Sequence, residues 1–350
     1  MSRCPRSILL RTPAHFARAF AAASWLALFA ALAPLSARAA ELELAFPLDC
    51  VPGESCWVAF YYDHDDSKGI ADYMCEPHTR DNHRGIDFAI RDLEAMAEGV
   101  EVRVAAAGVV RAVRDGMDDV NVREIGPEAV EDVECGNGVL VQHGEDWSTQ
   151  YCHLRKGSVA VKPGDRVETG QTLGLVGMSG LAEFPHLHLT VRHKGKKVDP
   201  FAGIEQGEPC GLGADPLWSE AALAAVPYEP VALYNYGITD GKPEAKDIRS
   251  GRYRTDALPA NAPALVLWTE VMAVEAGDHL SLKLVGPKGG TVAEKDWVLQ
   301  KTQPWRFQFV GAPLKGEAWP KGTFRGEIAL TREGAAGPIT VRREVSVEVR

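Results

Sequence analysis

The chain has 350 residues, enough for about two domains, and its charged fraction of 25% and hydrophobic fraction of 45% are those of a globular protein. Its formal net charge is −10, which becomes −15 once the five arginines of residues 1–39, a stretch without acids, are removed. This charge excludes a general electrostatic attraction to nucleic acid or anionic lipid, so we expect neither as a partner.

Residues 1–39 have the pattern of a secretory signal peptide. Four arginines precede an apolar run over 19–35, and Ser36-Ala37-Arg38-Ala39-Ala40 then forms a small-x-small cleavage pattern. The alternative is an uncleaved anchor helix, but the run contains Pro34 and is slightly short for a membrane span. No second run of this kind follows. The sequence therefore predicts an exported protein, periplasmic or secreted, with no membrane span in the mature chain.

The cysteines support export. Six of the seven remain after residue 39, and an even number in an exported chain indicates disulfides. The sequence does not choose among the pairings, although Cys50 and Cys56 bracket a Pro-Gly turn and could close a small loop. A cysteine zinc site is disfavoured because there is no CxxC pair. The six are Cys50, Cys56, Cys75, Cys135, Cys152 and Cys210.

Residues 40–77 are expected to form an irregular N-terminal segment with one short strand over 56–62. Asp63, Asp65 and Asp66 follow, with His64 among them. This cluster could bind a cation. A solvated loop is the favoured interpretation, because the spacing of these residues fits no calcium loop.

The next stretch, Asn82 to Ile90, contains His83 and Asp87. Gly85 and the alternation of apolar residues indicate a loop that enters a strand, with Asp87 on the face away from the apolar row. A carboxylate at that place would be costly if it were buried without a partner, and a metal ion would remove this problem.

Short β segments separated by glycine turns follow, which predicts an all-β core. The acidic segment 115–134 is expected to be a surface insertion, and residues 144–149 a turn. The expected strands are 100–105, 108–113, 138–143, 150–154, 161–167 and 169–177.

The last segment of this unit contains His186 and His188 within Pro185 to Leu189. If the segment is a strand, both imidazoles point to one face, while the leucines at 187 and 189 point into the core. Convergent imidazoles on a rigid strand suit a metal site, or a general base beside one. The alternative is an ordinary half-buried strand, because short motifs match by chance.

Residues 205–230 are expected to form a linker with a short helix, which starts at Asp215-Pro216 and ends near Ala225 before two prolines. From residue 231 to 350 the alternation and turn spacing predict an immunoglobulin-like β-sandwich. This region has no cysteine and only one histidine, His279, so we expect a structural or targeting module that could bind a protein partner.

Taken together, four motifs in order resemble the lysostaphin-like (LytM-type, beta-lytic) zinc metallopeptidases, which cut peptide bonds in bacterial peptidoglycan. They are His83-x3-Asp87, the strand from Tyr151 to Leu154, the glycine segment 167–177, and His186-Leu-His188. The resemblance covers residues 78–204. It implies a mainly β fold, in which an antiparallel β-sheet metallopeptidase core precedes the C-terminal β-sandwich.

Carried over residue by residue, the resemblance implies Zn²⁺ bound by His83, Asp87 and His188, with water in the fourth position. Three nitrogen and oxygen ligands with one open position are typical of catalytic zinc. His186 and His153 match the two catalytic histidines of the family that are not ligands. His186 is the preferred general base, while His153 would hydrogen-bond the water or the developing oxyanion.

Two features depart from the family pattern. Cys152 directly precedes His153, and we expect it to point away from the site and form a disulfide. The segment 115–134 is additional and is expected to shape one wall of the groove. The other histidines match no functional position of the family; they are His64, His78, His143, His193 and His279. Among them His78 is the next candidate for a site residue, because it lies five residues before His83.

The resemblance predicts an exported zinc endopeptidase that acts on the peptide stems of peptidoglycan. A crosslink that ends at D-alanine is the first choice of bond, and a glycine bridge the second. The alternatives are a catalytically silent regulator of other cell-wall hydrolases and an exported zinc protease acting on Gly-rich proteins. A further hypothesis is that residues 40–75 occlude the groove as an inhibitory segment.

Overall fold

The structure, a computed structural model, describes residues 42–204, 210–334 and 337–350. Residues 40–350 form one compact unit. The predicted signal peptide lies outside the described residues. Within the described ranges no helix is long and apolar enough to span a membrane.

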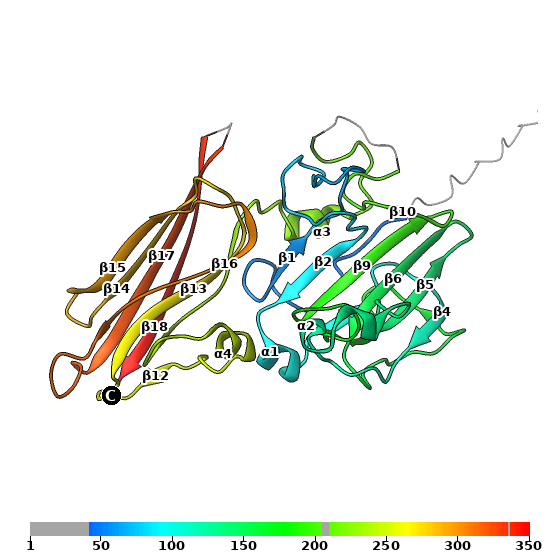
Figure 1. The fold of residues 1–350 in the computed structure, drawn as a ribbon. Helices are drawn as coiled ribbons and strands as arrows, with labels where there is room; N and C mark the ends of the chain where they lie inside the picture. The colour runs from blue at the N-terminus through cyan, green and yellow to red at the C-terminus, as the bar shows by residue number, and fades with distance from the viewer. Residues whose placement is uncertain (1–41, 205–209, 335–336) are drawn as a thin grey trace, which may run out of the picture. The chain divides into compact units, whose positions relative to one another are not determined.

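An antiparallel sheet of eight strands organises the first half of the unit (Figure 1). The strand order is β1-β2-β9-β6-β5-β4-β7, and β10 pairs with β9 at one end. A separate two-stranded sheet joins β3 to β8. The strands are β1 Cys56–Phe60, β2 Ile86–Ile90, β3 Glu101–Arg103, β4 Gly108–Arg114, β5 Asn137–His143, β6 Trp147–Leu154, β7 Arg166–Val167, β8 Thr172–Leu175, β9 His186–His193 and β10 Lys196–Val198.

Most expected strands of this region are present, although several differ in extent. The stretch 161–167 forms a strand only over Arg166–Val167, because residues 162–165 form a turn in which the Asp165 amide donates to the Lys162 carbonyl. Strand β6 begins at Trp147, three residues before the expected start, because Trp147 pairs with His143 across a tight turn. Gly144 in this turn has a φ of 64°, a conformation that glycine adopts without steric conflict. The turn is therefore shorter than the expected 144–149.

The connections carry three short helices. Helix α1 spans Leu93–Glu98 and is capped by Asp92, whose side chain accepts a hydrogen bond from the Ala95 backbone. The segment 115–134 contains helix α2 Val122–Ile125 and the 3-10 helix η1 Pro127–Val130.

The segment before β1 packs into the core instead of lying over it. Leu42, Leu44 and Leu48 are buried in the main hydrophobic cluster, together with residues of the central strands. Leu44 also forms a bridge with Trp218. Removal of this part would expose apolar surface, which argues against its acting as a removable inhibitory segment.

The predicted start of the linker helix is wrong. Helix α3 spans Glu220–Ala225 and begins after Ser219, whose side chain accepts a hydrogen bond from the Ala222 backbone. Residues 217 and 218 are extended because they hydrogen-bond and bridge to the Leu44 segment. This tertiary pairing overrides the local helix signal at Asp215-Pro216, whereas the end near Ala225 is confirmed.

The C-terminal region consists of two sheets that share one hydrophobic core (Figure 1). The sheet orders are β11-β13-β16 and β12-β18-β17-β14-β15. Helix α4, Ala245–Ser250, follows β11. The strands are β11 Ala232–Thr239, β12 Ala257–Leu258, β13 Ala264–Val274, β14 His279–Val285, β15 Thr291–Val298, β16 Gln303–Pro313, β17 Gly322–Gly334 and β18 Gly337–Val349. The mainly β prediction is confirmed.

A third hydrophobic cluster joins the two halves of the unit. It contains Trp57 and Phe60 of β1 together with Tyr234 of β11 and Met272 of β13. Trp305 of β16 packs against this cluster. The C-terminal region thus contacts the strand that lies beside β2.

Three disulfides pair the six cysteines: Cys50–Cys56, Cys75–Cys210 and Cys135–Cys152. The suggested local loop between Cys50 and Cys56 is confirmed, as is the role of Cys152 as a disulfide partner. Three disulfides are typical of proteins that reside outside the reducing cytoplasm.

Candidate metal centre

The register of β2 against β9 places the predicted site residues on one face of the sheet. Asp87 lies opposite His188, and Ala89 lies opposite His186. Leu187 and Leu189 point to the other face and are fully buried. The alternation predicted for this strand is therefore confirmed, and residues directly opposite on antiparallel strands have adjacent side chains.

Three possible ligand atoms converge from His83, Asp87 and His188. His83 Nε2 lies 3.1 Å from Asp87 Oδ1. His188 Nδ1 lies 2.7 Å from the same oxygen and 3.2 Å from His83 Nε2. In tetrahedral zinc sites with bonds of about 2.0–2.1 Å, ligand atoms lie about 3.3 Å apart. Two of the three separations are within about 0.2 Å of this value, and the His188–Asp87 separation would lengthen by about 0.6 Å to hold a zinc ion.

The remaining nitrogen of each ligand imidazole has a partner that fixes the ring. His83 Nδ1 lies 2.7 Å from the Tyr61 carbonyl oxygen, which can only accept, so Nδ1 carries the proton and Nε2 is free to bind a metal. His188 Nε2 lies 3.0 Å from the Thr190 hydroxyl, which in turn donates to the Arg84 carbonyl. His188 Nδ1 donates to the ionised Asp87 Oδ1 at 2.7 Å. A metal ion bound at Nδ1 would take the place of that proton, and Nε2 would then donate to the Thr190 hydroxyl.

The close approach of the His188 ring explains why position 85, in the first motif, is a glycine. A Cβ added there would lie 2.6 Å from the His188 ring and 2.7 Å from the Leu189 carbonyl oxygen. The absence of a side chain at Gly85 allows the His188 imidazole to occupy this position.

Asp87 is fully buried and ionised. Burial alone raises its pKa, but the imidazoles of His83, His186 and His188 hold the pKa of this carboxyl well below its usual range. Its second oxygen, Oδ2, accepts a hydrogen bond of 2.9 Å from Arg80 Nη2. With Oδ2 engaged in this way, Oδ1 remains the oxygen directed at the two histidine nitrogens.

His153 and His186 line the same site as neutral bases. Each donates from Nδ1 to a carbonyl oxygen, His153 to Ser179 at 2.7 Å and His186 to Phe184 at 2.8 Å. Burial lowers the pKa of His186 to about 4 and that of His153 well below its usual value. The two rings lie 4.6 Å apart between centroids. His186 Nε2 lies 3.7 Å from Asp87 Oδ2 and is buried without a hydrogen-bond partner.

His153 adopts a backbone conformation that is rare for residues other than glycine, with a φ of 63°. The Cys135–Cys152 disulfide lies immediately before it, and its amide donates to the Cys135 carbonyl. On the other side its carbonyl accepts from the Gly177 amide. These contacts hold a strained residue at the site, as is common for functional side chains.

All five residues predicted for the site are brought together, whereas His78, the next candidate, lies outside it. His78 is buried against Tyr61 and hydrogen-bonds the Glu229 carbonyl. His64 instead pairs with Asp199. The remaining three, His143, His193 and His279, belong to β5, β9 and β14 and take no part in the ligand triangle.

Two side chains at the site were not predicted from the sequence. Arg80 binds Asp87 and lies over the Phe60 ring at 4.4 Å. Phe184 stacks on the His186 ring at 4.5 Å. Arg80 precedes His83 by three residues in a polar loop, and nothing in the local pattern distinguishes it from a surface arginine. Phe184 lies directly before Pro185, and this proximity to the histidine motif was the only sequence feature that indicated a place near the site.

Comparison with known families agrees with this geometry. Residues 81–200 match the model of peptidase family M23. This region is an M23 peptidase domain. The chain is similar to peptidoglycan DD-endopeptidase ShyA of Vibrio cholerae, with 35% identity over 117 residues, which are 33% of this chain and 22% of ShyA. It is also similar to the DD-carboxypeptidase/endopeptidase Mpg of Neisseria gonorrhoeae, with 27% identity over 164 residues, 45% of this chain and 32% of Mpg.

Among solved structures, the chain is similar to a zinc-containing peptidase from Vibrio cholerae, with 24% sequence identity and a TM-score of 0.27. The match covers 42% of this chain and 39% of that one. The M23 domain thus spans a third or less of the two curated relatives, and the remainder of each chain lies outside the similarity.

Proposed function

We propose that this protein is an exported zinc-dependent endopeptidase that hydrolyses peptide crosslinks of bacterial peptidoglycan. The observation that carries the proposal is the convergence of three metal-ligand atoms beside two neutral histidines on one face of the sheet. An open metal position next to a general base is an arrangement that supports metal-assisted amide hydrolysis.

His83, Asp87 and His188 would hold the zinc ion, since their free atoms form a triangle of suitable size. When bound there, zinc supplies Lewis-acid chemistry that activates a water molecule at neutral pH and polarises a carbonyl group. Two nitrogen ligands and one oxygen ligand, without cysteine, match the donor set of catalytic zinc sites.

His186 acts as the general base in this proposal. Its Nε2 is unprotonated and unpartnered, so it can take a proton from the attacking water and deliver it to the leaving amine. His153 also presents an unprotonated Nε2, because its Nδ1 proton is engaged by Ser179. In that state His153 accepts a hydrogen bond from the water and thereby orients it, which favours the water-holding role over contact with an oxyanion.

The name of ShyA, a peptidoglycan DD-endopeptidase, supports a peptidoglycan substrate, and the name of Mpg also describes a DD-endopeptidase. We therefore propose the crosslink that ends at D-alanine as the bond cleaved. The three disulfides and the predicted signal peptide support a periplasmic or secreted location. We further propose that residues 231–350 form an accessory β-sandwich with immunoglobulin-like topology.

Digestion of purified peptidoglycan by the protein lacking residues 1–39 tests the proposal. Crosslinked dimers should disappear, a chelator should stop the reaction, zinc should restore it, and product masses identify the bond. His188→Ala should lose both zinc binding and cleavage, while His279→Ala, a histidine exposed on β14, should retain both. A zinc-loaded protein that leaves the dimers intact, or a fully active His188→Ala variant, contradicts the assignment.

A further inference from the structure

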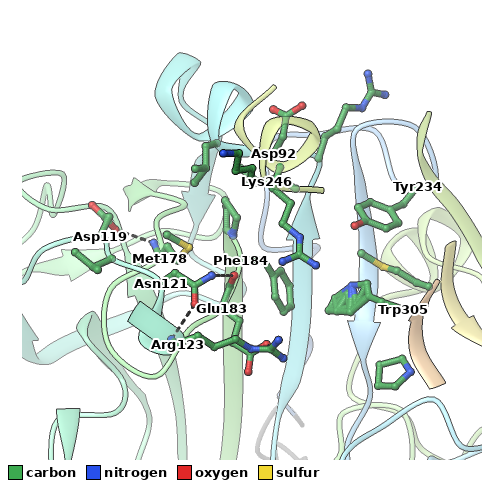
Figure 2. A pocket seen from close by; sticks show the side chains of 18 of the residues that line it. Asp92, Asp119, Asn121, Arg123, Met178, Glu183, Phe184, Tyr234, Lys246 and Trp305 are labelled. Carbon is green, nitrogen blue, oxygen red and sulfur yellow. Dashed lines mark hydrogen bonds and ion pairs between the residues drawn. The ribbon is translucent and has the colours of Figure 1, made fainter. Parts of the chain in front are cut away.

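A cavity of about 630 Å³ lies beside the candidate active site, within the size range of small-molecule and peptide sites. Its walls come from three parts of the chain (Figure 2). One is the segment after β2, with Arg91. Another is the inserted segment around Asn121, together with Phe184. The third is the C-terminal region, with Trp305 and Arg249.

Aromatic contacts connect the C-terminal wall to two histidines of the site. The Trp305 ring lies edge-on to Phe184, with centroids 4.8 Å apart (Figure 2). Phe184 in turn stacks on His186. On its other side Trp305 contacts Phe60 at 5.6 Å, and Phe60 in turn contacts His83 at 6.0 Å. A single layer of aromatic rings therefore separates the Trp305 wall from a candidate ligand and from the candidate base.

Most acidic groups that line the cavity already have partners. Both Asp119 oxygens accept backbone amides, from Lys156 and Met178. Asp92 caps helix α1 through Oδ1, which also lies 3.6 Å from Arg254 Nη1, while its buried Oδ2 has no hydrogen-bond partner. Glu183 pairs with Arg123 at 2.5 Å. Glu124 is exposed on α2.

The cations on helix α4 are largely free. Lys246 has no ion-pair partner among the described residues, and the one ion pair of Arg249, to Glu270, is long at 3.8 Å. Both side chains are exposed and line the cavity. This wall is therefore cationic in a protein whose net charge is negative. Such a local site attracts anionic groups that the protein as a whole repels.

We propose that this cavity is a substrate subsite that receives a peptide arm bearing a free carboxylate. Lys246 and Arg249 bind the carboxylate, while Trp305 and Phe184 cover the apolar part of the arm. The inference rests on the proposed function, because the peptide stems of peptidoglycan carry free carboxylates near their crosslinks. It makes the C-terminal region a contributor to substrate selection and not only a docking module.

The test compares the double variant Lys246→Ala/Arg249→Ala with a charge-matched control, Lys288→Ala/Arg342→Ala. The control removes two exposed cations that do not line the cavity. With a crosslinked muropeptide dimer as substrate, KM should rise about tenfold or more in the double variant, with little change in kcat and zinc content. Amidation of the dimer's carboxylates should raise KM for the wild-type protein to a similar extent and should not affect the double variant further.

Binding of the same dimer is measured in parallel by calorimetry in a His186→Ala background, in which the dimer should remain intact. This readout separates the two proposals, because the subsite can bind the dimer even if the protein does not cleave it. Carboxylate-dependent binding that the double variant loses supports the subsite. Equal Kd and KM values for the double variant and its control, or equal affinity for the amidated dimer, would overturn it.

Discussion

Replacement of Arg80 by alanine should weaken metal binding without removing any ligand. Arg80 Nη2 donates to Asp87 Oδ2, the oxygen that is not directed at the two ligand nitrogens. Asp87 is fully buried, so loss of this donor leaves part of a buried carboxylate unsatisfied and free to rotate. Partners that orient metal ligands in this way contribute on the order of 10–100-fold to metal affinity.

The structure places the expected effect at the lower end of that range. The Arg80 side chain is 47% exposed, so water can replace part of the lost hydrogen bonding. We therefore expect zinc affinity to fall about tenfold, which corresponds to about 1.4 kcal/mol. Competition for zinc with a chromophoric chelator measures this Kd directly, and far-ultraviolet circular dichroism checks that the fold is retained.

Arg84→Ala is the matched control for this measurement. Arg84 lies in the same loop, but its guanidinium binds Asp66 at 2.7 Å and the Asp63 carbonyl. Its removal should change the zinc Kd by less than about twofold, which lies within the usual variation for a surface charge. A zinc affinity in Arg80→Ala equal to that of Arg84→Ala would refute the proposed positioning role.

Two further predictions concern stability. Burial lowers the pKa of His78 to about 4, below the value of about 6.5 in an unfolded chain, so the unfolded state takes up a proton first as the pH falls. The free energy of unfolding should therefore decrease from about pH 6.5 to pH 4, by up to about 3 kcal/mol from this group. Urea unfolding of His78→Phe should show a flatter dependence of stability on pH than the wild-type protein. An equally steep dependence would contradict this role of His78. Removal of the Cys135–Cys152 disulfide by serine substitution of both residues should lower the free energy of unfolding by about 3 kcal/mol, because it frees a loop of 17 residues in the unfolded chain. Urea unfolding midpoints that do not change would show that this disulfide adds no net stability.

Local patterns in the sequence were sufficient for much of the fold and the site. Alternation along 186–189 predicted that His186 and His188 share one face while the leucines enter the core, and the register of β9 confirms it. Side-chain direction in a strand depends only on residue parity, so no knowledge of the partner strand was needed. The same applies to the strand that places Asp87 away from the apolar row.

Long-range contacts were decided by the tertiary structure alone. The extended conformation of residues 217 and 218 depends on pairing with the Leu44 segment, far away in sequence, and this pairing displaced the predicted helix start. The Cys75–Cys210 disulfide likewise joins residues 135 positions apart. Local propensity carries no information about such partners, since many registers satisfy the same alternation.

The sequence by itself therefore determined the residue types of the candidate centre and the faces on which they lie, and it predicted an export signal in residues outside the described part of the chain. Only the tertiary structure decided that Arg80 holds the second oxygen of Asp87 and that Trp305 reaches the site through Phe184. The physical reason is that side-chain parity and turn chemistry are set by neighbouring residues. The contact of Trp305 with Phe184 instead depends on how two distant sheets pack, which the packing of a whole core determines.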